Sequence, residues 1–163
     1  MYDKIKESLK LLLLKKRNIY FILIAIGIIT RMPFFSSFQI VTYDGTYYIN
    51  QAKYILGQPS PPGSFPIGYP ALIALLIPLL KNGVLAARII SLIAGIGLPV
   101  LVYELTTDYT RREYALAAGL LVAITPLCIR MSLVTMSESI YMFWVFLGLL
   151  LFSRGRELFA GIS

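Results

Sequence analysis

The feature that most constrains this chain is a set of apolar runs that approach or reach the length needed to cross a bilayer. A spanning helix needs about 20 mostly apolar residues, and the runs lie at residues 18–35, 84–105, 114–130 and 139–152. Charged residues make up only 14% of the chain, too few to cover so much apolar surface in water. The sequence therefore predicts an all-α, polytopic transmembrane bundle with about four spans, formed as a single module over residues 1–163.

The net charge of +7 would also suit a nucleic-acid-binding protein. The Lys and Arg residues, however, stand at the ends of apolar runs, as the positive-inside rule expects. We therefore expect membrane lipids as partners, and no nucleic acid. Residues 1–17 alternate charged and apolar side chains, which predicts an amphipathic segment on the cytoplasmic surface. No small-residue cleavage site follows the first run, so we interpret it as an uncleaved span.

One apolar segment, residues 70–80, is only about half as long as a span. If it does not cross, the basic N-terminus, the pair at 111–112 and the pair at 154–156 all fall on one side, as the positive-inside rule favours. We therefore predict a half-inserted helix within an external loop at residues 36–83. A second half-inserted helix in this loop, residues 43–57, ends at a helix-stopping glycine. Both chain ends are then cytoplasmic.

The residues that are missing exclude several kinds of chemistry. The chain has no His and one Cys, Cys128. It therefore cannot form an internal disulfide, a zinc site of the usual His and paired-Cys kind, or a Ser-His or Cys-His nucleophile. Acid–base chemistry near neutral pH must come from Asp, Glu, Tyr or Lys.

Only two acidic residues fall on the external side of this topology, Asp44 and Glu138. Each begins a helical segment beside the membrane. Asp44 can act as a helix N-cap, and Thr135 with Glu138 matches a Thr-x-x-Glu capping box. The alternative is a functional role, because an ionised carboxylate at the membrane surface can accept a proton.

External cations near these carboxylates also have two interpretations. Arg31 is close enough to the end of the first span to snorkel into the headgroups, and snorkelling is equally available to Lys81 and Arg88. Alternatively, they bind a lipid phosphate, which Arg recognises well through its bidentate fork. The tyrosines of the loop, among them Tyr69, form either an interfacial aromatic belt or a sugar-stacking surface.

Small residues recur at four-residue spacing in the second and third spans. They are Ala87, Ser91 and Gly95, followed by Ala115, Gly119 and Ala123. Such stripes allow helix backbones to approach closely in lipid, so we expect helix packing here.

The order of short motifs resembles a known family. The motifs are RMPFF at 31–35, DGTYY at 44–48, AKYILG at 52–57, PIGYP at 66–70, AAR at 86–88, TP at 125–126 and SE at 137–138. Over residues 24–152 the chain is similar to the N-terminal part of the GT-C membrane glycosyltransferases, which use polyprenyl-phosphate sugars. The nearest group is the protein O-mannosyltransferase-like family, which includes the lipid A aminoarabinose transferases.

The resemblance implies inverting sugar transfer at the external face. It assigns the catalytic base to Asp44 and a second acidic position to Glu138, with phosphate or substrate contacts from Arg31, Lys81, Arg88 and Tyr69. The implied partners are a polyprenyl-phosphate-linked sugar donor and a protein, lipid or glycan acceptor. Where the family often has a second acid, this chain has Gly45, which weakens a metal-binding interpretation; we predict no cofactor, and dependence on a divalent metal stays open.

The resemblance also implies a location and a relation to longer proteins. We expect the plasma membrane of a prokaryote, with the N-terminus in the cytoplasm. Because members of the family are much longer, we expect this chain to be the N-terminal portion of an enzyme.

Two other function classes stay open at this point. One is a non-catalytic membrane protein, such as a lipid-carrier-binding subunit of a glycosylation system. The other is a small transporter, which the apolar centres of the spans disfavour, because transporters place ionisable residues at mid-membrane.

Overall fold

The computed structural model describes residues 15–37 and 40–155, and within these ranges it is helical without strands. The helices are α2 (Lys16–Phe35), α3 (Tyr43–Ile55), α4 (Gly68–Leu80), α5 (Gly83–Thr107), α6 (Arg112–Ile124), α7 (Pro126–Met131) and α8 (Glu138–Ser153). The central helix is α5, which contacts α2, α3, α4, α6, α7 and α8. The predicted all-α membrane bundle is confirmed.

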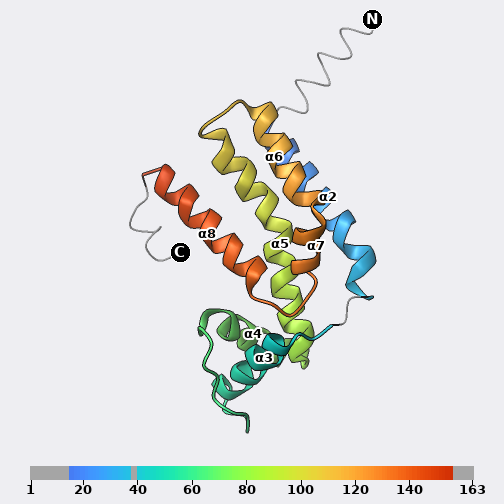
Figure 1. Cartoon of the computed structure of the whole chain (residues 1–163), viewed down its shortest axis with the longest axis vertical. Helices are drawn as coiled ribbons and strands as arrows, with labels where there is room; N and C mark the ends of the chain where they lie inside the picture. The colour runs from blue at the N-terminus through green and yellow to red at the C-terminus, as the bar shows by residue number, and fades with distance from the viewer. Residues whose placement is uncertain (1–14, 38–39, 156–163) are drawn as a thin grey trace, which may run out of the picture.

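The helices are arranged so that the two ends of the bundle differ. In Figure 1, α2, α5, α6 and α8 run along the long axis, whereas α3 and α4 gather at one end, which we call the loop end. The start of α2, the turn between α5 and α6, and the end of α8 lie at the opposite end. That basic end carries Lys15, Lys16, Arg17, Arg111, Arg112 and Arg154.

The outward faces of the helices are apolar. Within the described residues, α2 and α5 are long and apolar enough to cross a membrane, and α4 and α8 are shorter apolar helices. Large apolar side chains point away from the protein on several helices, including Phe21 at 76% exposure and Leu79 at 77%. Such surface is stable against lipid rather than water, because apolar surface is unfavourable in contact with water and neutral in contact with lipid chains.

The third predicted span, residues 114–130, is two helices rather than one. The first, α6, ends at Ile124, Thr125 is extended, and α7 begins at Pro126. Proline has no N–H to donate, and it disfavours helical geometry at the residue before it. The interrupted ladder frees the carbonyl of Ala123, which accepts hydrogen bonds from the side chains of Thr30 and Arg31 instead, each at 3.2 Å.

The stripes of small residues pack as expected. A Cβ on Gly95 would lie 2.2 Å from the Cβ of Ser132, so only glycine allows the segment after α7 to lie against α5. On α6, a Cβ on Gly119 would lie 2.9 Å from the carbonyl oxygen of Pro99. Both stripes are therefore used for close packing onto α5.

An ionic network ties the helices together at the basic end. The buried carboxylate of Glu104, on α5, accepts hydrogen bonds from Lys16 at 3.1 Å, from the Tyr20 hydroxyl at 2.5 Å and from Arg154 at 2.6 Å. Arg154 also pairs with Asp108 at 3.3 Å. The network joins α2 and the end of α8 to α5, at the opposite end from α3 and α4.

Candidate functional site

The N-terminus of α3 is fixed to the segment that precedes α8. The Thr42 backbone N–H donates to the Thr135 hydroxyl at 3.2 Å, and the Thr42 hydroxyl donates to the Thr135 carbonyl at 3.2 Å. Gly45 lies directly against the same residue, because a Cβ there would be 2.0 Å from the Thr135 hydroxyl oxygen. One turn later, the hydroxyls of Tyr48 and Ser137 share a hydrogen bond of 2.9 Å.

The capping roles predicted for Asp44 and Glu138 are wrong. The N-cap of α3 is Thr42, whose hydroxyl accepts from the Gly45 N–H at 3.0 Å, and Asp44 lies in the first turn after it. The N-cap of α8 is Ser137, and it forms no side-chain cap hydrogen bond. Thr135 lies two residues before this N-cap, and its hydroxyl accepts a hydrogen bond from the Thr42 N–H. Neither carboxylate is therefore needed as a cap.

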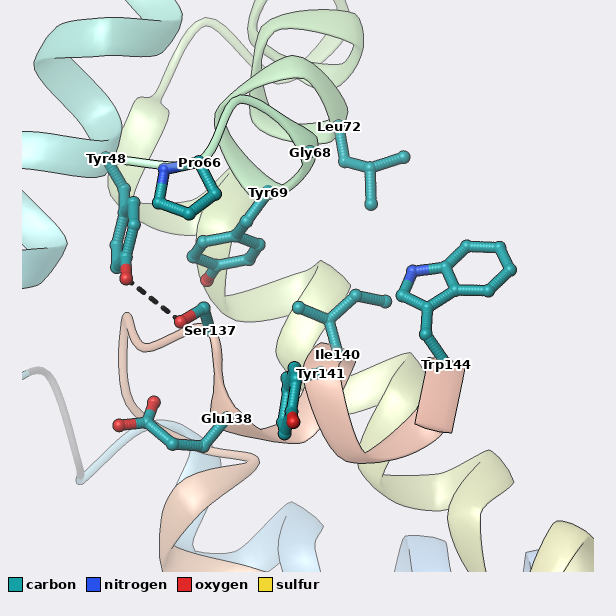
Figure 2. A pocket seen from close by; sticks show the side chains of 10 residues that line it. All are labelled: Tyr48, Pro66, Gly68, Tyr69, Leu72, Ser137, Glu138, Ile140, Tyr141 and Trp144. Carbon is teal, nitrogen blue, oxygen red and sulfur yellow. Dashed lines mark hydrogen bonds between the residues drawn. The ribbon is translucent and has the colours of Figure 1, made fainter. Parts of the chain in front are cut away.

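A cavity of about 580 Å³ lies between α3, the start of α4 and the start of α8 (Figure 2). Its lining is largely aromatic and aliphatic, with one carboxylate. The lining residues are Tyr48, Pro66, Gly68, Tyr69, Leu72, Ser137, Glu138, Ile140, Tyr141 and Trp144. Largely apolar cavities with a few polar groups are typical ligand sites.

Glu138 provides the one charge among these lining residues. Its Oε2 atom is buried and has no hydrogen-bond partner among the described residues. Figure 2 shows its side chain extending below the Tyr48–Ser137 pair, at the side of the cavity nearest α3. A buried carboxylate oxygen without a partner is costly unless a ligand or water satisfies it.

Tyr69 is held rigidly in the wall of this cavity. It is 5% exposed, and its hydroxyl contacts the Ala87 carbonyl at 3.0 Å and the Ser91 hydroxyl at 2.9 Å, both on α5. Burial raises the pKa of Tyr69; its hydrogen bond to Ser91 opposes the rise, and the nearby charge of Glu138 adds to it. The hydroxyl is therefore engaged with α5, and the ring is what Tyr69 presents to a ligand.

Arg31 does not snorkel, so that prediction is wrong. The side chain is 0% exposed, between α2 and the junction of α6 and α7. Its Nε donates to the Ser132 hydroxyl at 2.8 Å, and one terminal nitrogen donates to the carbonyls of Gly27 and Ala123 at 3.1 and 3.2 Å. The other terminal nitrogen has no partner among the described residues. The break between α6 and α7 gives Arg31 a carbonyl acceptor inside the bundle, so the side chain does not need to reach the lipid headgroups for a partner.

Arg88 is also buried, at 5% exposure. Its Nε donates to the Leu133 carbonyl at 3.1 Å, and a terminal nitrogen donates to the Phe35 carbonyl. The guanidinium carbon lies 4.3 Å from the centre of the Phe35 ring. Arg88 therefore joins α5 to the end of α2 and to the segment on which α3 rests.

The structure thus brings only some of the predicted residues together. Tyr69 and Glu138 line one cavity, and the helix turn that carries Asp44 lies against the segment before Glu138. Arg31 and Arg88 lie within the bundle, whereas Lys81 is exposed and lines another cavity. The described residues contain no cluster of three or more His, Cys, Asp or Glu that could hold a metal ion.

Sequence reasoning missed the cavity residues of α8. Tyr141 and Trp144 follow Glu138 at three-residue intervals, so the three lie near one face of the helix. This spacing alone could not distinguish them from an interfacial aromatic belt, because Tyr and Trp are common at the ends of spans.

Comparison with known proteins gives one match. A family model described as dolichyl-phosphate-mannose-protein mannosyltransferase matches residues 64–157, which is more than half of the chain. The matched range includes Tyr69, Lys81, Arg88 and Glu138, whereas Arg31 and Asp44 precede it. Searches of curated proteins and of solved structures found no match.

Proposed function

The chain belongs to the dolichyl-phosphate-mannose-protein mannosyltransferase family, and from this premise we propose that it transfers a sugar from a polyprenyl-phosphate donor to an acceptor. Membership of this family supports a glycosyltransferase of the mannosyltransferase type, and no more specific activity. The finer parts of the proposal are ours: a protein, lipid or glycan acceptor, inversion at the anomeric carbon, Asp44 as base, and a reaction at the external face.

One observation supports the proposal most strongly. Glu138 lines the cavity between α3, α4 and α8 and has one buried carboxylate oxygen without a partner among the described residues, and the Thr42–Thr135 hydrogen bonds fasten the α3 N-terminus to the segment that leads into Glu138. The two external carboxylates are therefore carried by elements that are fixed to each other. Such fixing is what acid–base catalysis requires, since the reacting groups must be held in position.

The proposed step is a single displacement. The acceptor oxygen or nitrogen attacks the anomeric carbon and loses its proton to Asp44. The bond between the anomeric carbon and the phosphate oxygen breaks, and its electron pair leaves with the polyprenyl phosphate. Attack opposite the leaving group inverts the anomeric configuration, as in other single-displacement sugar transfers. Glu138 accepts hydrogen bonds from hydroxyl groups of the sugar or the acceptor.

The leaving phosphate needs positive charge nearby. Of the two predicted cations that contact the segment beneath α3, Arg31 donates to the Ser132 hydroxyl, and Arg88 donates to the Leu133 carbonyl, one residue nearer to Thr135. We assign Arg88 an electrostatic and positioning role from behind this segment.

The test uses the full-length gene product and a polyprenyl-phosphate donor with a radiolabelled sugar. We expect Asp44→Asn to lower transfer by about 10²–10⁴-fold, the usual contribution of general-base catalysis, while the protein elutes from size exclusion as before. Glu113→Gln, an exposed acid at the basic end, should leave transfer unchanged. Full transfer by Asp44→Asn would remove the proposed base.

The same assay separates the enzyme from a carrier-binding subunit. A wild-type protein that retains the labelled donor but never releases the sugar would overturn the enzyme proposal in favour of the subunit. For an active enzyme, the anomeric configuration of the product, measured by NMR, tests inversion.

A further inference from the structure

We propose that a second cavity, at the corner between α4 and α5, binds the phosphate of an anionic membrane lipid. This cavity of about 530 Å³ is separate from the one that holds Glu138, and no residue lines both. Tyr69 borders the first and Ile77 the second, so about 12 Å of helix α4 separates them. The inference stands whether or not the proposed function is correct.

Two lysines from different helices face this cavity. Lys53 lies in the last turn of α3, and Lys81 ends α4 with a left-handed backbone, at φ 52°. The cavity lining contains no acidic residue, and neither lysine forms an ion pair within the described residues. The nearest acid on α3, Asp44, is nine residues from Lys53, about 13 Å along the helix. The two positive charges are therefore available to an anion.

The backbone adds to this positive charge. The 25-residue helix α5 begins at Gly83, inside the cavity lining, with the side chain of Asn82 accepting from the Leu85 N–H at 3.0 Å. The first N–H groups of a helix have no partner within it, and its N-terminus carries partial positive charge. The α5 N-terminus thus points at the same space as Lys53 and Lys81.

The surroundings favour a lipid over a soluble anion. The cavity lining also has an apolar part, which includes Ile49, Ile77 and Val84. The neighbouring face of α4 exposes Leu75 at 75% and Leu79 at 77%, which places lipid chains within two residues of Lys81. A lysine just beyond a lipid-facing surface lies at the level of the headgroups, where it meets phosphate.

The test measures lipid retention by native mass spectrometry of the full chain in detergent. Each basic side chain near an anionic surface contributes about fivefold to binding. We therefore expect Lys53→Gln with Lys81→Gln to weaken retention of phosphatidylglycerol about thirtyfold, with an unchanged size-exclusion profile. Lys53→Arg with Lys81→Arg should retain the lipid, and so should Arg130→Gln, an exposed cation on α7.

Three results would overturn the proposal. The first is equal retention of phosphatidylglycerol by the wild type and the double Gln variant. The second is equal retention of phosphatidylcholine and phosphatidylglycerol by the wild type. The third is displacement of the bound lipid by an equal concentration of inorganic phosphate, which would assign the cavity to a soluble anion.

Discussion

Replacing Gly45 with alanine tests the contact that holds α3 to the rest of the bundle. The new Cβ would lie 2.0 Å from the Thr135 hydroxyl oxygen, 2.5 Å from its carbonyl oxygen and 2.7 Å from its Cβ. The hydroxyl can rotate away, but the carbonyl oxygen moves only with the backbone. We therefore expect Gly45→Ala to lift the start of α3 away from Thr135.

The magnitude follows from the bonds that this displacement breaks. Two hydrogen bonds join Thr42 to Thr135, and a third joins Tyr48 to Ser137. Each contributes about 0.5–1.5 kcal/mol, and overpacking a close contact usually costs about 1–3 kcal/mol. Because α3 keeps its contacts with α4, we expect the opening free energy to fall by about 2 kcal/mol, which corresponds to a roughly thirtyfold larger opening equilibrium constant.

Hydrogen exchange followed by mass spectrometry measures this local effect directly. We expect amides of α3 to exchange about thirtyfold faster in Gly45→Ala, while those of α5 keep their protection. Gly68→Ala is the matched control, because a Cβ at that residue has nothing within 4 Å. Adding Thr135→Ala should not restore protection, since the carbonyl oxygen remains. Unchanged exchange of α3 in Gly45→Ala would refute the reasoning.

Two further predictions concern stability. Arg31→Met removes the donors to Gly27, Ala123 and Ser132. At about 1.5–3 kcal/mol for a hydrogen bond to a charged group, the melting temperature should fall by roughly 3–12 °C. An unchanged melting temperature would exclude the structural role. The hydrogen bond from Arg154 lowers the pKa of Asp108 below its ordinary value of 3.8. The ionised carboxylate therefore adds to the stability of the folded protein above that pH, and this stability is lost as the pH falls through the folded-state pKa. Melting curves should show a drop below about pH 4 that is smaller in Asp108→Asn, and an equal drop in both proteins would contradict the assignment.

The bundle and its loop end could be predicted because lipid imposes simple rules. The length of apolar runs and the placement of Lys and Arg indicated helices along the bundle, with residues 70–80 set apart as a short helix. The structure places that helix, α4, beside α3 at one end. Both signals are local in sequence, so they can be interpreted without knowledge of the tertiary contacts.

The errors came from residues whose behaviour depends on distant neighbours. Arg31 resembles a snorkelling residue until the break at Pro126 supplies carbonyl acceptors inside the bundle. Thr135 matches a capping box three residues before Glu138, but its hydroxyl accepts a hydrogen bond from the backbone N–H of Thr42, 93 positions away. A pattern read along one helix cannot include a competitor from another part of the chain.

The central claim is that the end carrying α3 and α4 faces outward and the basic end faces the cytoplasm, and cysteine labelling tests it most directly. With Cys128→Ser as background, Thr46→Cys reports on α3 and Thr110→Cys on the basic end, and both positions are exposed. A membrane-impermeant maleimide added to intact cells should label Thr46→Cys at once and Thr110→Cys only after permeabilisation. The reverse pattern would place the proposed site in the cytoplasm and contradict the account.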